Sequence, residues 1–262
     1  MASADPFAEL ARHYDPLMAH VDYGRWFFTA DALTELLPPV FTHVDAGCGT
    51  GVFLERTRGA GWRSAGVDLS PAMLRSARRT RGALPVAVAD LRALPLHNGA
   101  HFITCLFDSL NFLLEEEDVR RAFRSLAGAL RPGGLLYFDA VTERMMTEHF
   151  ADQAWTEDTG GFRTTWDNAY DPATKICTTR VKVGGRAESV TRERAYPLDW
   201  IADQVQEAGM EVLGVFDAHT WKGATRRSIR ADFVAALNPR PEQVRAIRGV
   251  AATVRRFLGQ GV

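Results

Sequence analysis

The stretch 44–53 reads VDAGCGTGVF, in which one acid precedes three glycines spaced two residues apart. The acid is Asp45, and the glycines are Gly47, Gly49 and Gly51. Because glycine has no Cβ, backbone N–H groups in such a turn can approach a ligand closely. The N-terminus of a helix that follows the turn carries positive partial charge. The stretch therefore predicts a loop that binds a nucleotide-like ligand.

Two further acids follow apolar runs downstream of the glycines. Asp68 lies in AGVDLS and Asp90 in AVADL, each at the carboxyl end of a predicted strand. A carboxylate has two acceptor oxygens, so Asp68 can accept hydrogen bonds from both hydroxyls of a ribose. A nicotinamide dinucleotide site needs the spacing G-x-G-x-x-G, and here the third glycine, Gly51, falls one place early. The pattern thus disfavours a nicotinamide-dependent dehydrogenase.

Short apolar runs alternate with amphipathic segments around these motifs. The runs that predict strands are 43–47, 64–69, 85–90, 101–107 and 135–141, and later 211–218 and 229–237. The segments that predict helices between and around them are 51–61, 70–82, 118–134 and 197–210. Such alternation is typical of a parallel sheet with helices on both faces. Ligands of such sheets bind beyond the carboxyl ends of the strands, where the glycines and both acids would meet.

The chain changes character at its two ends and after residue 150. Residues 5–37 show helical spacing and predict two helices before the sheet. The stretches 164–171, 175–183 and 188–196 alternate polar and apolar residues and predict antiparallel strands. A final amphipathic helix is predicted over 241–260. We expect an N-terminal helical cap at 1–39, a core at 40–150, a β insertion at 151–196, the rest of the core sheet at 197–237 and a C-terminal helix at 238–262.

The segment from Val44 to Gly51 resembles the first motif of the class I S-adenosylmethionine-dependent methyltransferases, an acid followed by G-x-G-x-G. In that family an acid ends the second strand and another follows the third, as Asp68 and Asp90 do here. The cap and the β insertion resemble the small-molecule members of the family. The resemblance implies a Rossmann-like, doubly wound, seven-stranded and mostly parallel sheet. It also implies S-adenosylmethionine as cofactor and S-adenosylhomocysteine as product.

The resemblance further implies which residues bind the cofactor. The expected set is Tyr14, Asp45, Ala46, Gly47, Gly49, Gly51, Asp68, Leu69, Met73, Asp90, Leu91 and Phe107. In it, Asp68 holds the ribose, Asp90 accepts from the adenine amino group, and the N–H of Leu91 meets a ring nitrogen. Asp68 or Asp90 taken alone could instead cap a helix or a turn. Phe107 and Tyr14 could instead be core aromatics.

A sulfonium-bound methyl group needs an aligned nucleophile and a dry site more than a strong base. His149, His219 and Tyr196 are weak candidates for a base, and each histidine could equally be a surface or core residue. No cluster has metal-ligand spacing, so we expect no metal. The expected acceptor is a small molecule, with an amine nitrogen as the favoured target.

Composition limits the alternatives. The formal net charge is -1, which gives no overall field to attract nucleic acid or an anionic membrane. The arginines of 225–230 and of the last 25 residues keep an RNA methyltransferase as an alternative, and a non-catalytic S-adenosylmethionine-binding protein is another. Three widely spaced cysteines and the absence of a long apolar run predict a cytoplasmic protein. We expect a monomer or a homodimer.

Overall fold

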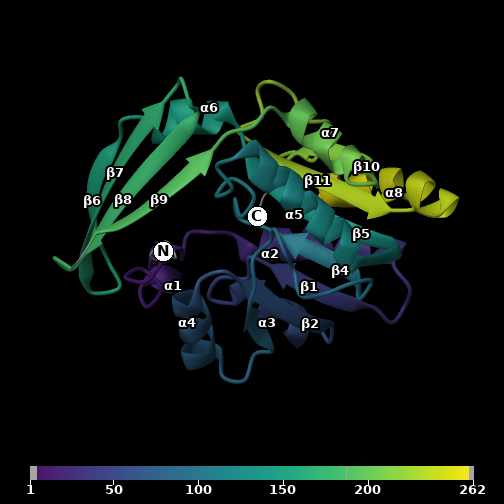
Figure 1. The fold of residues 1–262 in the computed structure, drawn as a ribbon, viewed down its shortest axis with the longest axis horizontal. Coiled ribbons are helices and arrows are strands. Elements are labelled where there is room, and N and C mark those ends of the chain that lie inside the picture. The colour runs from purple at the N-terminus through teal and green to yellow at the C-terminus, as the bar shows by residue number, and fades with distance from the viewer. Residues whose placement is uncertain (1–4, 187, 260–262) are drawn as a thin grey trace.

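The structure is a computed structural model that describes residues 5–186 and 188–259 (Figure 1). Its main sheet has seven strands in the order β10-β11-β5-β4-β1-β2-β3. Their bounds are β1 Thr42–Ala46, β2 Arg63–Asp68, β3 Val86–Val88, β4 Ala100–Cys105, β5 Leu130–Val141, β10 Met210–Asp217 and β11 Arg230–Leu237. Strand β11 is antiparallel to both of its neighbours, β10 and β5, and the other paired strands of this sheet are parallel. The predicted Rossmann-like, mostly parallel α/β fold is confirmed.

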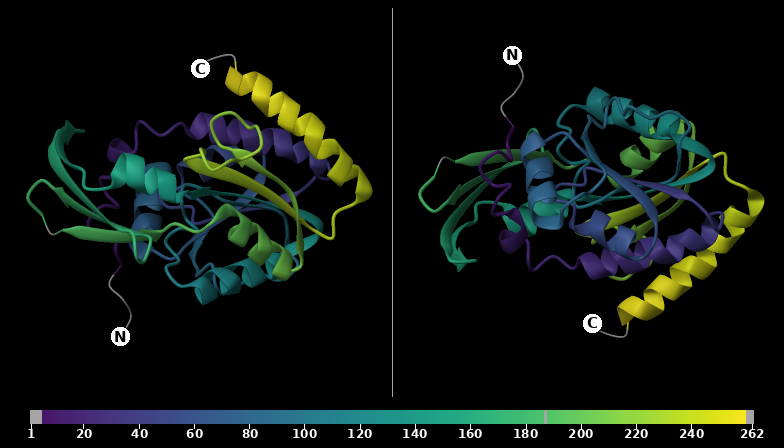
Figure 2. Two further views of the ribbon diagram at one scale, coloured as in Figure 1. Left: turned by 90° about the horizontal axis from the view of Figure 1, so that it is seen from above. Right: turned by 90° about the horizontal axis from the view of Figure 1, so that it is seen from below.

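Helices cover both faces of this sheet (Figure 2). Their bounds are α1 Tyr14–Leu17, α2 Tyr23–Leu33, η1 Thr34–Leu36, α3 Val52–Gly59, α4 Pro71–Arg81, α5 Glu116–Ala129, α6 Glu143–Met145, η2 Met146–Phe150, α7 Leu198–Glu207 and α8 Pro241–Gly259. On one face Leu33 of α2 and Val250 of α8 pack in a cluster with Tyr137 of β5. On the other face Phe123 of α5 packs in a cluster with Phe138. Alternate residues of β5 therefore serve two separate cores, as strand geometry requires.

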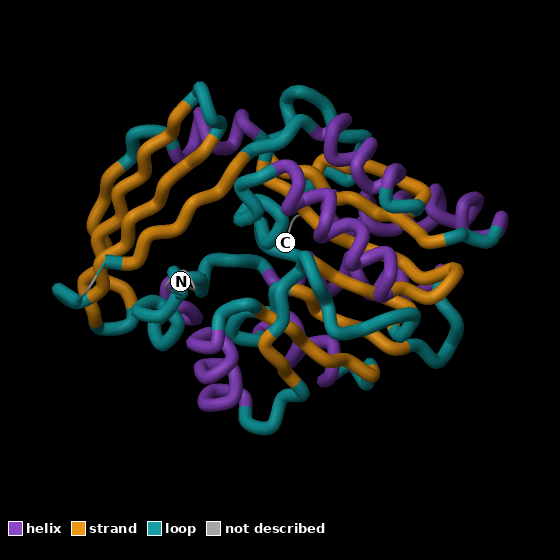
Figure 3. The backbone as a smooth tube through the Cα atoms, in the orientation of Figure 1, coloured by secondary structure: helices purple, strands orange, loops and turns teal. Residues whose placement is uncertain are grey.

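A second, four-stranded antiparallel sheet stands beside the main sheet (Figure 3). Its strands in order are β6 Ala154–Thr159, β7 Phe162–Asp171, β8 Ile176–Val183 and β9 Ser189–Arg194. Strand β6 was not predicted from the sequence. Leu10 and Leu17 of the N-terminal segment pack in one cluster with Val181 and Val183 of β8. The N-terminal segment therefore lies against the second sheet.

Two predicted elements differ from the structure. The first of the two helices expected in 5–37 is only the single turn α1, preceded by turns. The helix predicted over 118–134 ends at Ala129, and β5 begins at Leu130. Proline disfavours a helical conformation of the residue before it, so Pro132 explains an end before the glycines. The expected cap and C-terminal helix extend into residues 1–4 and 260–262, which lie outside the described residues.

Within residues 5–186 and 188–259, no helix is both long enough and apolar enough to cross a lipid bilayer.

Candidate cofactor and acceptor site

The glycine loop turns from β1 into α3 through left-handed backbone conformations. The φ angles of Gly47, Gly49 and Gly51 are 81°, 54° and 82°. A Cβ on Gly47 would lie 2.4 Å from Oγ of Ser109, which only glycine avoids. A Cβ on Gly49 would have no described atom within 4 Å. The loop is therefore packed at its start and open at its centre, where a ligand can meet the backbone.

Asp68 lies at the end of β2 and anchors this open centre. Its Oδ2 accepts from the N–H of Gly49 at 2.8 Å, and its Oδ1 accepts from the N–H of Ser70 at 2.8 Å. Burial raises the pKa of Asp68, while these two N–H groups lower it. Each carboxylate oxygen keeps a second acceptor position. The side chain is therefore placed to accept two ribose hydroxyls.

Two exposed apolar side chains lie at the carboxyl ends of neighbouring strands, next to Asp68. Leu69 is 61% exposed and Val88 is 56% exposed. Val88 is the partner of Asp68 across β2 and β3, and large apolar side chains this exposed offer apolar surface to a ligand at this edge of the sheet. Leu69 was predicted, and Val88 was missed because the sequence does not show which strand residues lack cover.

Asp90 follows β3 and is held by Arg92. The guanidinium donates to Asp90 at 2.6–3.0 Å and also pairs with Asp118 of α5 at 2.7 Å. Hydrogen bonds from Arg92 are the main reason that the pKa of Asp90 is lowered. Leu91 packs partly buried on the core, and Met73 is buried against Ala11. The roles of these residues toward adenine stay predictions.

Asp45 is buried under the glycine loop at the end of β1, and its neighbour Ala46 lies in the core. Its Oδ1 accepts from Oγ1 of Thr104 at 2.8 Å, and that hydroxyl also contacts Nε2 of His43 at 2.9 Å. Burial raises the pKa of Asp45 to about 7, although the hydroxyl of Thr104 lowers it.

The Asp45→Asn variant tests this buried acid. A carboxyl whose folded pKa is raised contributes stability below its unfolded pKa of about 4, and this is lost as pH rises through about 7. Asparagine has no charge to bury and can still accept from Thr104. Relative to the wild type, the variant should therefore gain roughly 1–4 kcal/mol of unfolding free energy between pH 4.5 and pH 8. Urea unfolding at both pH values measures the gain, and an equal difference at both contradicts the burial effect.

The N-terminal segment crosses the site and is tied to it by ion pairs and hydrogen bonds. Asp15 of α1 accepts from Oγ1 of Thr50 and pairs with Arg81 of α4 at 2.7 Å. Asp5 accepts from Oγ of Ser70 at 2.7 Å. These contacts close the glycine loop from the side opposite the core.

Tyr14 is part of this segment and lies among acids. Burial raises the pKa of its phenol, and the charges of Asp108, Glu193 and Asp68 raise it further, together with Tyr23. The charge of Asp68, the acid predicted to hold the ribose, and those of two acids from other parts of the chain therefore all act on Tyr14.

The chain turns sharply after β4 at Phe107 and Asp108, whose φ angles are 59° and 64°. Non-glycine residues adopt this conformation at an energetic cost, and pairs of them are typical of functional sites. The ring of Phe107 lies 5.5 Å from that of Trp26 and 6.3 Å from that of Tyr23, centroid to centroid. The guanidinium of Arg230 lies over the rings of Trp26 and Phe107, at 5.7 and 5.9 Å.

Arg230 joins two acids at this turn. It forms ion pairs with Asp108 and with Asp139 of β5. Asp139 is fully buried, its pKa is raised by burial to about 7, and no described group donates to its Oδ1. Opposite it in β11, Asp232 is also fully buried and accepts from Nε1 of Trp221 at 2.7 Å.

We call the side chains of Arg230, Asp108, Asp139, Asp232, Glu193 and Arg25 the buried charge cluster. Burial raises the pKa of Glu193 to about 8, with a further contribution from Asp108. Arg25 acts on the same acids, because its charge lowers the pKa of Asp232. The sequence analysis missed this cluster as a site. The one signal in the sequence was an acid inside each of the apolar runs LLYFDAV and RADFVAAL.

The three weak base candidates lie in different settings. His149 in η2 and His219 after β10 are exposed. The hydroxyl of Tyr196 donates to the carbonyl of Leu113 at 2.6 Å, and its ring stacks on that of Trp200. Nothing in these surroundings supports a proton-transfer role for any of the three.

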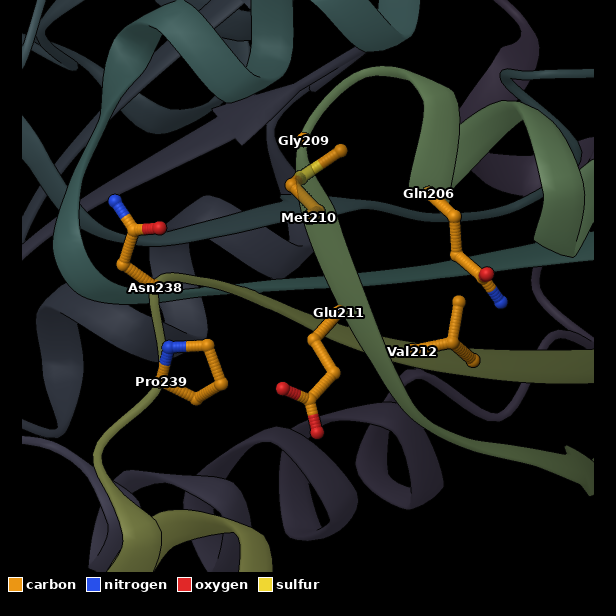
Figure 4. A pocket seen from close by; sticks show the side chains of 7 residues that line it. All are labelled: Gln206, Gly209, Met210, Glu211, Val212, Asn238 and Pro239. Carbon is orange, nitrogen blue, oxygen red and sulfur yellow. The ribbon is translucent and has the colours of Figure 1, made fainter.

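A hollow lies at the other edge of the main sheet (Figure 4). It is lined by Gln206, Gly209, Met210, Glu211, Val212, Asn238 and Pro239. Because β10 begins and β11 ends there, it faces away from the carboxyl ends of the parallel strands. It is therefore separate from the glycine loop. In the part of the chain that the structure describes, no three His, Cys, Asp or Glu side chains are grouped to hold a metal ion.

Comparison with known proteins agrees with this geometry. Residues 44–134 match the family described as "Methyltransferase domain". The chain is a class I S-adenosylmethionine-dependent methyltransferase. It is 29% identical to a putative methyltransferase of Geobacillus sp. (strain WCH70) over 244 residues, which cover 87% of this chain and 98% of that protein.

Two further proteins place this methyltransferase among its relatives. It is 34% identical over 143 residues to a dTDP-4-amino-2,3,4,6-tetradeoxy-D-glucose N,N-dimethyltransferase of Saccharopolyspora spinosa, covering 50% of this chain and 57% of that protein. An S-adenosylmethionine-dependent methyltransferase from Clostridium acetobutylicum ATCC 824 has the same fold, with a TM-score of 0.76 and 23% identity. That alignment covers 88% of this chain and 98% of the other.

The residues of this methyltransferase fit its cofactor. The open backbone at Gly49, the free acceptor positions of Asp68 and the exposed side chains of Leu69 and Val88 suit amide-, ribose- and adenine-type contacts respectively. Asp68 and Gly49 are already hydrogen-bonded to each other, so the carboxylate that is predicted to accept the ribose hydroxyls is held in one orientation.

Proposed function

We propose that this methyltransferase transfers the methyl group to an amine nitrogen of a small molecule. The observation that carries the proposal is the buried charge cluster beside Phe107. In it, four carboxyl groups face two guanidinium groups, so the cluster carries an excess of negative charge when its acids are ionised. A cationic amine is the acceptor that such a site attracts best.

The chain's own residues have three tasks in the proposed reaction. When bound, S-adenosylmethionine supplies a methyl group on a positively charged sulfur, which keeps the bonding electrons as the acceptor's lone pair takes the methyl. Asp68 and the glycine loop hold the cofactor in place. The N-terminal segment, tied down through Asp15, and the rings of Trp26 and Phe107 exclude water. Catalysis then rests mainly on alignment.

A carboxylate acceptor fits the site less well. Its charge would be opposed by the four acids of the cluster, and the guanidinium of Arg230 is already paired with Asp108 and Asp139. The other cation, Arg25, has a buried Nη1 without a described partner, but it is outnumbered by these acids. The relative in Saccharopolyspora spinosa is named for an N,N-dimethyltransferase that acts on a nucleotide-linked amino sugar. That name supports an amine acceptor for this chain and makes amino sugars the first compounds to test.

The RNA alternative also loses support. The run 225–230 that suggested it ends in Arg230, whose side chain is only 13% exposed and is bound inside the cluster. Fewer arginines of that run are therefore available to phosphates.

Methyl transfer to a matched panel of acceptors tests the proposal. The panel pairs amino sugars, free and dTDP-linked, with sugars that carry a hydroxyl at the same carbon, and adds dicarboxylates and total RNA. We expect S-adenosylhomocysteine to form at least about a hundredfold faster with amines than with the matched hydroxyl compounds, because a neutral hydroxyl is a far weaker nucleophile. We expect none to form with dicarboxylates or RNA. Turnover of a hydroxyl, a carboxylate or RNA with no amine turnover would overturn it.

A further inference from the structure

We propose that Glu193 of β9 binds the acceptor's ammonium group through Oε2 and takes one of its protons before methyl transfer. The inference rests on the proposed amine acceptor and names the residue that selects it. It also assigns a task to the second sheet, since β9 belongs to that sheet and not to the cofactor-binding core.

The end of β9 is fixed against the loop that follows β4. The N–H of Arg194 donates to the carbonyl of Asn111 at 2.8 Å, and Nδ2 of Asn111 donates to the carbonyl of Arg194 at 2.9 Å. A guanidinium N–H of Arg194 also donates to the carbonyl of Leu114 at 2.9 Å. Asn111 follows the Phe107–Asp108 turn by only a few residues. These contacts hold Glu193, the neighbour of Arg194, at the acceptor side of the turn.

The carboxylate of Glu193 has an unused acceptor inside the molecule. Its Oε2 is buried, and no described group donates a hydrogen bond to it. The fully buried Asp139 likewise has an oxygen, Oδ1, without a donor among the described residues. Buried carboxylate oxygens are nearly always hydrogen-bonded in proteins. With Oδ1 of Asp232 the cluster holds three such oxygens, against one buried donor without a described partner, Nη1 of Arg25. The excess of acceptors indicates a missing donor, and an ammonium group supplies up to three N–H donors.

The surroundings of Glu193 come from several elements. The acids Asp108 and Asp139 and the cation Arg230 act on its charge, and Glu193 in turn acts on Tyr14 and on Cys177. Cys177 is its partner across β8 and β9. The charges of both Glu193 and Asp68 act on Tyr14. Glu193 therefore links the second sheet electrostatically to Tyr14, on which the charge of Asp68 in the predicted cofactor site also acts.

Aromatic rings line the same region. The faces of Trp26 and Phe107 already carry one cation, the guanidinium of Arg230. Aromatic faces and a carboxylate together stabilise ammonium groups. A neutral hydroxyl gains little from either, which gives the site a means of choosing amines.

The proton step needs no further reactant. One N–H bond of the ammonium breaks, the nitrogen keeps the electron pair, and an O–H bond forms at Oε2 of Glu193. The proton later leaves to water. Burial and Asp108 raise the pKa of Glu193 to about 8, which brings it much closer to that of an alkylammonium than an ordinary carboxyl would be.

Sinefungin tests the inference without a known acceptor. In this analogue of S-adenosylmethionine a C–NH₃⁺ group replaces the S–CH₃⁺ group, so it carries an ammonium toward the acceptor side. Calorimetric titrations compare sinefungin with S-adenosylhomocysteine, which lacks that group. We expect the wild type to bind sinefungin at least about tenfold more tightly, as a charge-assisted hydrogen bond provides. The Glu193→Gln variant should lose most of that preference and keep its affinity for S-adenosylhomocysteine within about twofold.

Dependence on pH gives a second readout. The sinefungin affinity of the wild type should rise between pH 6.5 and pH 8 as Glu193 ionises, and that of Glu193→Gln should stay flat. At pH 7 wild-type binding should release a proton, which titrations in buffers of different ionisation enthalpy count. Glu188→Gln is the matched control, because Glu188 pairs with Lys182 at the surface of the same sheet. It should behave as the wild type does.

The outcomes separate the inference from the proposed function. Equal affinity of the wild type for both ligands, or an equal loss for both in Glu193→Gln, overturns the role of Glu193 alone. Failure of the wild type to bind either ligand overturns the proposed function and this inference with it. Misfolding of Glu193→Gln is checked separately as a cause of lost binding. Glutamine keeps the shape of the side chain, and thermal unfolding of the variant shows whether it is folded.

Discussion

Replacing Asp68 with alanine is expected to weaken binding of both S-adenosylmethionine and S-adenosylhomocysteine at least about tenfold. The change removes an acceptor for two ribose hydroxyls, and hydrogen bonds to a charged group contribute about 1.5–3 kcal/mol each. It also removes the acceptor that anchors the N–H of Gly49 at 2.8 Å. Isothermal titration calorimetry measures both ligands against the wild type. The same loss is expected for both, because the ribose that Asp68 is predicted to hold belongs to the half that they share.

Two controls make the Asp68 result specific. Asp68→Asn keeps the shape and one acceptor oxygen, so it should fall between the wild type and Asp68→Ala. Glu211→Ala removes an acid from the hollow at the other edge of the sheet and should leave both affinities unchanged. If Asp68→Ala binds as the wild type does, Asp68 does not hold the ribose. If Glu211→Ala weakens binding, the cofactor site has been placed at the wrong edge.

The core fold and the cofactor loop could be predicted because their signals are local. An apolar run, a turn and an amphipathic segment follow each other within about 30 residues in each unit, and each unit must pack in the same way. The glycines at 47, 49 and 51 need positive φ angles at fixed positions, and the structure has them there. Asp68 ends β2, as the sequence predicts. These features depend on neighbours in the chain.

Other parts of the site depend on residues that are distant in the sequence. Asp90 has the spacing of an adenine-binding acid, yet nothing in that spacing indicates that Arg92 would pair with both it and Asp118. The first predicted helix is a single turn, and Leu10 and Leu17 of its segment pack on β8, which is distant in the sequence. Tertiary contacts outweigh local propensity in such segments.

The buried charge cluster shows the same limit most clearly. Asp108, Asp139, Glu193 and Arg230 meet only because β11 pairs antiparallel with β5 and the end of β9 is tied to the loop after β4. No local pattern links these positions. The sequence signal for the cluster was an acid within an apolar strand run, because burying a carboxylate is costly unless it has a partner or a function.

Replacing Arg230 with methionine is expected to lower the unfolding free energy by about 3–5 kcal/mol at pH 8. The side chain of Arg230 is 13% exposed, and those of Asp108 and Asp139 are 12% and 0% exposed. Methionine fills much of the same volume, so the loss comes mainly from two buried carboxylates that lose the cation they pair with. Urea unfolding of the wild type and Arg230→Met at pH 8 measures the difference.

The loss in Arg230→Met should shrink as pH falls. The pKa of Asp139 is about 7 even with Arg230 present, and removing that cation raises it further. A carboxyl with a raised folded pKa contributes stability below its unfolded pKa, and this is lost as pH rises through the folded value. At pH 4.5 Asp139 of the variant is therefore largely protonated, and much of the destabilisation should be absent. The triple variant Arg230→Met, Asp108→Asn and Asp139→Asn should recover most of the stability at pH 8. A loss that is independent of pH, or no recovery in the triple variant, would show that Arg230 stabilises the fold by packing and not by balancing buried charge.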